Sequence, residues 1–354
     1  MKLFTVGPVA CYPEVLEAMG RQMVSHRSKE YTSMHYETVE QLKGFLETEN
    51  PVFLFSSTGT GFMEAAVRNC VAEKMIVCVN GSFGKRFAEV AEANGREVVK
   101  VVTKLGEPVT PEMIKEALDA NPDAEAVAIT HNETSTGMLN DLPSLTKVVK
   151  DYDKLCFVDG VSSMGGTEIK ADAWNIDIMF SSSQKCFGVP PGIGIGSVSQ
   201  RALDVSAKMP NKGWYFDLKV WEKNHASGKG TPMTSTIPQI AGLNAALTMI
   251  DVMGGKQAYF DLFKRRNMAI RNGIKEHGLV TYAKKGYESP TVNCISAPEG
   301  MSGPDIYNAM RTHGFELAQG YGDLKPSTFR VGNMGWIPDG YIAEMLNALG
   351  KVVS

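Results

Sequence analysis

Leu155-Cys156-Phe157-Val158-Asp159-Gly160 is a short apolar run that ends on an acid and a glycine. A second apolar run, Ile176–Phe180, leads directly into Ser181-Ser182-Ser183-Gln184-Lys185. Short apolar runs that stop at glycine or polar residues are typical of buried strands. The sequence therefore predicts two successive strands whose carboxyl ends carry an acid and a lysine, with hydroxyl groups beside the lysine.

The chain before residue 236 alternates apolar runs with amphipathic segments, which is typical of an α/β fold. The runs are almost continuous in Val, Ile and Leu, which favours a mostly parallel sheet covered on both faces. We expect strands at Val52–Ser56, Met75–Asn80, Glu97–Val102, Ala126–Thr130, Leu155–Asp159, Ile176–Ser181 and Ile193–Ser197. Helices are expected between them, among others at Phe62–Val71, Lys85–Asn94, Pro111–Asn121 and Ser144–Asp153.

The pattern changes after Thr236-Ile237-Pro238. Two helices are expected next, Gln239–Met253 and Gln257–His277, separated by the helix-stopping pair Gly254-Gly255. Short strands near Val292–Ile295 and Phe329–Val331 and a final helix, Tyr341–Val352, complete the pattern. We expect an N-terminal arm (1–12), a large domain with a seven-stranded sheet (13–255) and a smaller C-terminal α+β domain (256–354).

The composition is that of an ordinary globular enzyme, with 43% hydrophobic and 21% charged residues. The net charge of -3 and the lack of a Lys/Arg run argue against a nucleic-acid partner. No stretch approaches ~18 apolar residues, and Gly7-Pro8 interrupts the N-terminus too early for a signal peptide. The 6 cysteines lack metal-like spacing, and Cys78 and Cys156 fall inside strand runs, so a reducing, cytoplasmic setting is expected.

Small and polar residues follow the expected strands at their carboxyl ends, where ligands gather in open parallel sheets. Ser56–Gly61 runs straight into a helix, so its backbone N–H groups and hydroxyls could hold an anion. It matches neither the dinucleotide nor the Walker loop, and an ordinary strand-to-helix turn is the alternative. Phe83, after the next strand, could stack on a flat heterocycle or anchor the core.

Two further clusters carry polar groups. His131–Gly137 follows a strand, and a metal site from His131 and Glu133 would lack further ligands at suitable spacing. Arg330 stands inside a short apolar run, where an arginine needs an anionic partner. That partner is either a substrate carboxylate, bound by the guanidinium fork, or a carboxylate of the protein itself.

The acid, the lysine and the hydroxyls are together what pyridoxal 5′-phosphate requires. Its aldehyde forms a Schiff base with a lysine amine, its pyridine nitrogen stays protonated against a carboxylate, and its phosphate needs donors. Each residue alone would be a helix cap or a solvated charge. Their joint occurrence predicts a pyridoxal phosphate site built on Asp159 and Lys185.

With these residues assembled, the whole chain resembles the class V aminotransferases of fold-type I, a family of pyridoxal phosphate enzymes. The resemblance runs from Thr5-Val6-Gly7-Pro8 through Ser57–Ala65 to Phe329–Gly332. Within the family the chain is similar to the alanine/serine–glyoxylate and the 2-aminoethylphosphonate–pyruvate transaminases. The stretches that look closest to the phosphonate branch are His131–Met138, Asp159–Gly166 and Arg330–Gly335.

The resemblance implies a role for each matching residue. Lys185 would form the Schiff base and shuttle a proton, and Asp159 would pair with the pyridine nitrogen. The other expected cofactor contacts are Phe83 and Val161 on the two ring faces, Thr134 near the ring oxygen, and Thr58, Gly59, Thr60, Gln184 and Thr236 at the phosphate. Thr236 would come from a partner subunit, which implies a homodimer with shared sites.

The substrate site would contain Arg330, which binds the α-carboxylate, and Gly7. Met233 stands where some relatives place a tyrosine, so the phosphate contact of that tyrosine is not expected here.

The implied activity is a ping-pong transamination from a small amino acid, of the alanine or serine type, to pyruvate or glyoxylate. A 2-aminoethylphosphonate–pyruvate transaminase is the alternative, with His26, Arg27 and Lys29 either serving the phosphonate or lying on the surface. A cysteine desulfurase-like lyase would need a nucleophilic cysteine ahead of Arg330, and none lies between Gly314 and Arg330. A catalytically silent protein is argued against by the joint presence of lysine, acid and arginine.

Overall fold

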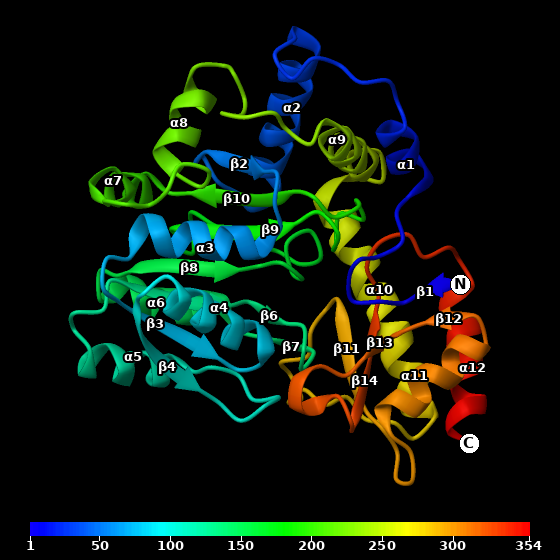
Figure 1. Cartoon of the computed structure of the whole chain (residues 1–354). Helices are drawn as coiled ribbons and strands as arrows, with labels where there is room; N and C mark the ends of the chain where they lie inside the picture. Colours follow the sequence, from blue (N-terminus) through cyan, green and yellow to red (C-terminus); the bar gives the residue numbers. More distant parts are fainter.

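The computed structural model describes all 354 residues. Its centre is a seven-stranded sheet with the order β2-β10-β9-β8-β5-β3-β4 (Figure 1). The strands are β2 (Val52–Phe55), β10 (Gly194–Val198), β9 (Ile178–Ser182), β8 (Leu155–Asp159), β5 (Ala126–Thr130), β3 (Lys74–Val79) and β4 (Glu97–Val102). All neighbouring pairs from β9 to β4 are parallel, and β10 runs antiparallel to both of its neighbours. The predicted α/β fold with a mostly parallel seven-stranded sheet is confirmed.

The central strands are apolar along their whole length because both faces of the sheet are covered. In β8, Cys156 and Val158 belong to one hydrophobic cluster, whereas Leu155 and Phe157 belong to the cluster on the opposite face. Successive side chains of a strand point to opposite faces, so a strand buried on both sides has no polar alternation.

Helices cover both faces (Figure 1). One face is packed by α3 (Gly59–Cys70), α4 (Ser82–Ala93), α7 (Gln200–Lys208) and α8 (Leu218–Ala226). The other is packed by α1 (Pro13–Met19), α2 (Lys29–Leu46), α5 (Pro111–Ala120), α6 (Leu142–Asp151) and α9 (Ile237–Val252). Thr110 caps α5, since its side chain accepts a hydrogen bond from the N–H of Met113.

A second, smaller sheet has the antiparallel order β11-β14-β13. Its strands are β11 (Val292–Ser296), β14 (Thr328–Gly332) and β13 (Ala318–Gln319). A separate hydrophobic cluster joins this sheet to α10 (Gly255–Glu276), α11 (Gly303–Thr312) and α12 (Tyr341–Val353). The N-terminus lies against this part of the chain, because β1 (Lys2–Leu3) pairs in parallel with β12 (Phe315–Glu316) (Figure 1).

Two short features complete the fold. β6 (Asn132–Glu133) and β7 (Met138–Leu139) form a hairpin directly after β5. The 3-10 helix η1 (Gly322–Leu324) lies between β13 and β14. None of the helices combines the length and the hydropathy that crossing a bilayer requires.

Candidate active site

The predicted acid and lysine lie at the same edge of the large sheet. β8 ends on Asp159, and β9 ends at Ser182, shortly before Lys185. Because β8 and β9 are parallel neighbours, their carboxyl ends meet at one edge. Both charged side chains are buried, with exposed fractions of 3% for Asp159 and 8% for Lys185.

The carboxylate of Asp159 accepts one hydrogen bond, from the backbone N–H of Val161 at 2.8 Å. Burial raises the pKa of this carboxyl to about 7, against the opposing effects of the Val161 N–H and of the charges on Lys185 and Arg86. A carboxylate with so few partners retains the capacity to pair with a further cation.

Lys185 donates a hydrogen bond from Nζ to the carbonyl oxygen of Val6 at 2.6 Å. Burial, followed by the charge of Arg330, lowers the pKa of the Lys185 amine to about 8. An amine with this pKa is partly unprotonated near neutral pH, as a nucleophile or a base must be.

Gly7 lies directly against this amine. Its φ is +111°, and a Cβ at this position would lie 2.5 Å from the Nζ of Lys185. A larger residue would therefore push the lysine aside and strain the backbone. The structure thus brings Gly7 and Lys185 together.

Arg330, on β14, is buried with 6% of its surface exposed. Nε donates to the carbonyl of Gln319 at 2.9 Å, and Nη1 donates to the carbonyl of Thr134 at 3.0 Å. No carboxylate of the protein forms an ion pair with it, so the alternative of a structural ion pair is wrong. The remaining guanidinium donors are free for an anion, and the Arg330 charge is close enough to depress the pKa of Lys185.

Thr134 and Phe83 lie in the same neighbourhood. The hydroxyl of Thr134 is 2.7 Å from that of Ser162. Phe83, at the start of α4, donates its N–H to the buried carboxylate of Glu133, which also accepts from Gly84 and Ser135. Glu133 therefore holds the start of α4 in place.

The first turn of α3 lies beside the turn after Asp159. A Cβ on Gly59 would be 2.3 Å from a methyl group of Val161, so only glycine permits this approach. Thr58 is the N-cap of α3 and its side chain makes no capping bond. Thr58 and Thr60 are both exposed, which leaves their hydroxyls free beside a helix N-terminus, a favourable place for an anion.

The two other residues predicted at the phosphate differ in position. Gln184 is half-buried next to Lys185 and accepts a hydrogen bond from the hydroxyl of Ser182. Thr236 is the N-cap of α9 without a side-chain capping bond, and no hydrogen bond joins it to the residues around Lys185.

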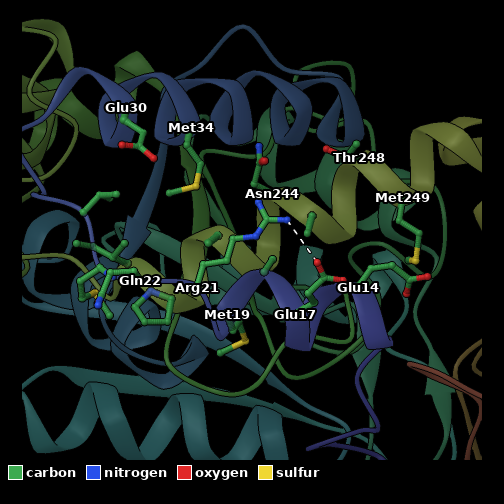
Figure 2. A pocket seen from close by; sticks show the side chains of 17 residues that line it. Glu14, Glu17, Met19, Arg21, Gln22, Glu30, Met34, Asn244, Thr248 and Met249 are labelled. Carbon is green, nitrogen blue, oxygen red and sulfur yellow. Dashed lines mark hydrogen bonds and ion pairs between the residues drawn. The ribbon is translucent and has the colours of Figure 1, made fainter.

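A groove of about 500 Å³ lies between α1, α2 and α9 (Figure 2), and Lys185 is not among the residues that line it. Figure 2 shows Met19, Met34 and Met249 on its walls beside charged residues such as Glu17 and Arg21. None of the predicted cofactor residues lines it, although Ile237 and Pro238, which directly follow Thr236, do.

The residues weighed for alternative functions have other contacts. Arg27 donates to the carbonyls of Lys229 and Thr231 at 3.0 and 2.7 Å, so it holds the segment before α9 in place. Cys186 and Cys294 are buried, and burial raises the pKa of their thiols to about 12 and about 11. Neither thiol is suited to act as a nucleophile.

Two residues near the site did not stand out in the sequence. Arg86 lies one helical turn after Phe83, and its charge reaches both Asp159 and Lys185. Tyr321 precedes η1, with its ring against both Phe83 and Arg330. The spacing of Phe83 and Arg86 could have suggested a shared helix face, whereas no local pattern points to Tyr321.

The groups present fit pyridoxal phosphate. A buried carboxylate with one hydrogen bond, a buried amine of lowered pKa and an uncapped helix N-terminus lie at one sheet edge.

The family model described as aminotransferase class-V matches residues 10–336. The chain belongs to the class V aminotransferase family. It is therefore a transaminase with pyridoxal phosphate as its cofactor, as the sequence predicted.

Similar proteins agree with this assignment. An uncharacterized aminotransferase of Methanocaldococcus jannaschii is 36% identical over 337 residues, covering 94% of this chain and 87% of that protein. The serine–glyoxylate aminotransferase of Methylorubrum extorquens is 33% identical, covering 94% and 86%. The crystal structure of an alanine–glyoxylate aminotransferase from Nostoc sp. superposes with a TM-score of 0.94 at 28% identity, covering 100% and 95%.

Not every relative is named as a transaminase. The small subunit of a soluble hydrogenase from Synechococcus sp. is 32% identical, covering 99% of this chain and 92% of that protein. The comparisons therefore establish the family. The relatives differ in the activity and the substrates that their names give.

Proposed function

We propose that this class V aminotransferase transfers an amino group from a small amino acid, of the alanine or serine type, to glyoxylate or pyruvate by a ping-pong mechanism. The observation that carries the proposal is the guanidinium of Arg330. Two backbone carbonyls hold it in place, it has no carboxylate partner, and its charge lowers the pKa of Lys185. One arginine matches one α-carboxylate, which both substrates of such a reaction carry. The names of the serine–glyoxylate and alanine–glyoxylate relatives support glyoxylate as the acceptor.

In the proposed mechanism, pyridoxal phosphate supplies an aldehyde that takes the amino group and a ring that withdraws electrons from the substrate Cα. The carboxylate of Asp159 holds a proton on the pyridine nitrogen. Lys185 would remove the proton from the substrate Cα as a general base, and the carbonyl of Val6, which accepts a hydrogen bond from its amine, would hold that amine in place.

The remaining contacts bind and orient. Arg330 fixes the α-carboxylate so that the Cα–H faces Lys185, and Gly7 leaves room for both. Phe83 and Val161 would hold the ring of pyridoxal phosphate, and the hydroxyl of Thr134 would serve as a hydrogen-bonding group for it. Phosphate contacts come from Thr58, Gly59, Thr60 and Gln184, at the N-terminus of α3 and beside Lys185.

The phosphonate alternative has less support. The candidate cations were His26, Arg27 and Lys29. Arg27 donates its hydrogen bonds to backbone carbonyls, and Lys29 is exposed. Arg86 is a cation near the site without an ion-pair partner, so a second anionic group on the donor deserves a test. Aspartate and 2-aminoethylphosphonate are therefore both included in the experiment below.

We also propose a homodimer in which Thr236 of the partner subunit completes the phosphate site. The side chain of Thr236 makes no capping bond to α9, and the residues that directly follow it line the groove of Figure 2. The exposed Leu16 and Met23 adjoin this region, as expected of a surface that another subunit covers.

The division into an arm (1–12), a large domain (13–255) and a small domain (256–354) also stays a proposal, supported by the separate hydrophobic cluster around the small sheet. A cytoplasmic setting is proposed as well, because all 6 cysteines are unpaired.

The experiment is a spectral titration of the purified, cofactor-loaded protein with alanine, serine, aspartate, cysteine and 2-aminoethylphosphonate, followed by glyoxylate and pyruvate. We expect alanine or serine to bleach the cofactor band and glyoxylate to restore it. Bleaching by 2-aminoethylphosphonate alone would establish the alternative, and sulfide release from cysteine would revive the lyase. No bleaching by any amine would contradict the proposal.

A further inference from the structure

Tyr321 contacts three residues of the site at once. Its ring lies nearly parallel to that of Phe83, with centroids 5.7 Å apart and an interplanar angle of 19°. The guanidinium carbon of Arg330 lies 5.5 Å from the Tyr321 ring centroid. Arg86 donates a hydrogen bond to the Tyr321 hydroxyl at 2.8 Å.

These contacts connect two distant parts of the chain. Phe83 and Arg86 belong to α4, which packs on the large sheet, whereas Tyr321 lies in the segment between β13 and β14 of the small sheet. Arg330 itself lies on β14 and is bound by one carbonyl from each part, that of Thr134 and that of Gln319. Tyr321 is therefore a second bridge beside Arg330.

The carbonyls alone do not fix the plane of the guanidinium. Each of them accepts from one nitrogen, so the group can still tilt about the line that joins the two bonds. A ring placed over the group restrains this tilt, and guanidinium groups are attracted to aromatic faces. Tyr321 is 37% exposed and Arg330 only 6%, so the tyrosine also shields the arginine from solvent.

We propose that Tyr321 is a positioning residue of the carboxylate site. Its ring orients Arg330 for bidentate binding, and its hydroxyl, held by Arg86, ties that orientation to the helix that carries Phe83. The proposal rests on the proposed role of Arg330. Because donor and acceptor both carry an α-carboxylate, loss of Tyr321 weakens both to the same extent and leaves the proton transfer at Lys185 intact.

The first test compares the KM values of the Tyr321→Leu and Tyr321→Phe variants. Tyr321→Leu removes the ring, and we expect KM for the amino donor and for the oxo acid to rise together by about five- to thirtyfold, the range of a shielded cation–ring contact. Tyr321→Phe keeps the ring and loses only the bond to Arg86, so a rise of about two- to threefold is expected. In both variants kcat stays within about twofold of its original value.

Tyr152→Leu is the matched control. Lys115 lies 5.9 Å from the centroid of the Tyr152 ring, a similar contact on the surface between α5 and α6. This variant should leave both KM values unchanged. Equal KM values in Tyr321→Leu and the original protein, or a fall in kcat with KM unchanged, would overturn the proposal.

A second readout does not depend on turnover. L-lactate carries a carboxylate but neither an amine nor a keto group, and its binding to the cofactor-free protein can be followed by calorimetry. Its affinity should fall by the same factor in Tyr321→Leu and by more in Arg330→Lys. If lactate affinity falls in this way but no amine bleaches the cofactor band, transamination is refuted and the role of Tyr321 stands. Unchanged lactate affinity in Tyr321→Leu, in a protein that transaminates, would refute the role of Tyr321 alone.

Discussion

The carboxylates at the two ends of the large sheet differ in how many hydrogen bonds they accept from the protein. At the amino-terminal end, Glu125 accepts the N–H groups of Ala72, Glu73 and Lys74. Asp172 there accepts hydrogen bonds from three consecutive residues, 48–50. At the carboxyl end, Asp159 is more deeply buried and yet accepts one hydrogen bond, from Val161.

The difference separates residues that stabilise the fold from residues kept available for a ligand. A carboxylate whose oxygens are all bonded to the protein contributes to stability and has nothing left to offer. A buried carboxylate that accepts few hydrogen bonds destabilises the folded protein when it is charged. The raised pKa of Asp159 reflects this cost. The same contrast holds between lysines and between arginines at the two ends, and matched substitutions can test each pair.

The largest effect is expected for the two lysines. Lys185→Ala should lower kcat by at least about 10⁴-fold, because it removes both the cofactor attachment and the general base. Lys74, at the start of β3, pairs with Glu97 and Asp123 at 2.9 and 2.8 Å. Lys74→Ala should keep kcat within about twofold and lower the free energy of unfolding only slightly, because both ion pairs lie at the surface. Steady-state kinetics measure kcat, and urea unfolding measures the free energy of unfolding. Full activity in Lys185→Ala would contradict the proposed difference between the two lysines.

The two aspartates come next. Asp159→Asn should lower kcat by about 10²–10³-fold, the usual cost of losing one preorganised electrostatic partner. Asp172→Asn should leave kcat unchanged and reduce stability by about 0.5–1.5 kcal/mol, because acceptors for three donors are disturbed.

The cofactor-free protein adds a test of the raised pKa. The Asp159 carboxyl has a folded pKa of about 7, above its value of 3.8 in an unfolded chain. Its contribution to stability is therefore complete below about pH 4 and is lost as the pH rises through 7. Asp159→Asn cannot ionise, so it should exceed the original protein in free energy of unfolding at pH 8, by up to about 4 kcal/mol, with the gap closing toward pH 4. Urea unfolding across this range measures the gap, and a constant difference would show that Asp159 is not held in an unfavourable charged state.

The smallest effect is expected for the two arginines. Arg330→Lys keeps the charge and loses the fork, so KM for both substrates should rise by about 10- to 100-fold. Arg201, at the other end of the sheet, pairs with Asp153 at 3.0 Å, and Arg201→Lys should leave KM unchanged. A KM in Arg330→Lys that changes for one substrate only would mean that the two carboxylates bind in different places.

Much of this arrangement could be predicted from the sequence. The central strands could be predicted because each is a short run buried on both faces, and Asp159 and Lys185 lie at or just after the ends of such runs. Helix starts were less exact: α3 begins at Gly59 and α4 at Ser82, ahead of the predicted Phe62 and Lys85. Their first turns consist of small and polar residues, so the apolar pattern begins later than the helix.

The contacts that cross between sheets could not be predicted. The bond of Lys185 to the Val6 carbonyl and the stacking of Tyr321 on Phe83 join residues far apart in the chain. No periodicity records such pairs, because they depend on how the small sheet packs beside the large one.

The most direct test of the site is to find which lysine carries the cofactor. Borohydride treatment of the loaded protein, followed by proteolysis and mass spectrometry, fixes a pyridoxyl group on the lysine to which the cofactor is bonded. The account predicts the modification on Lys185 and its absence after pretreatment with a reactive amino donor. Modification of another lysine, or of none, would contradict it.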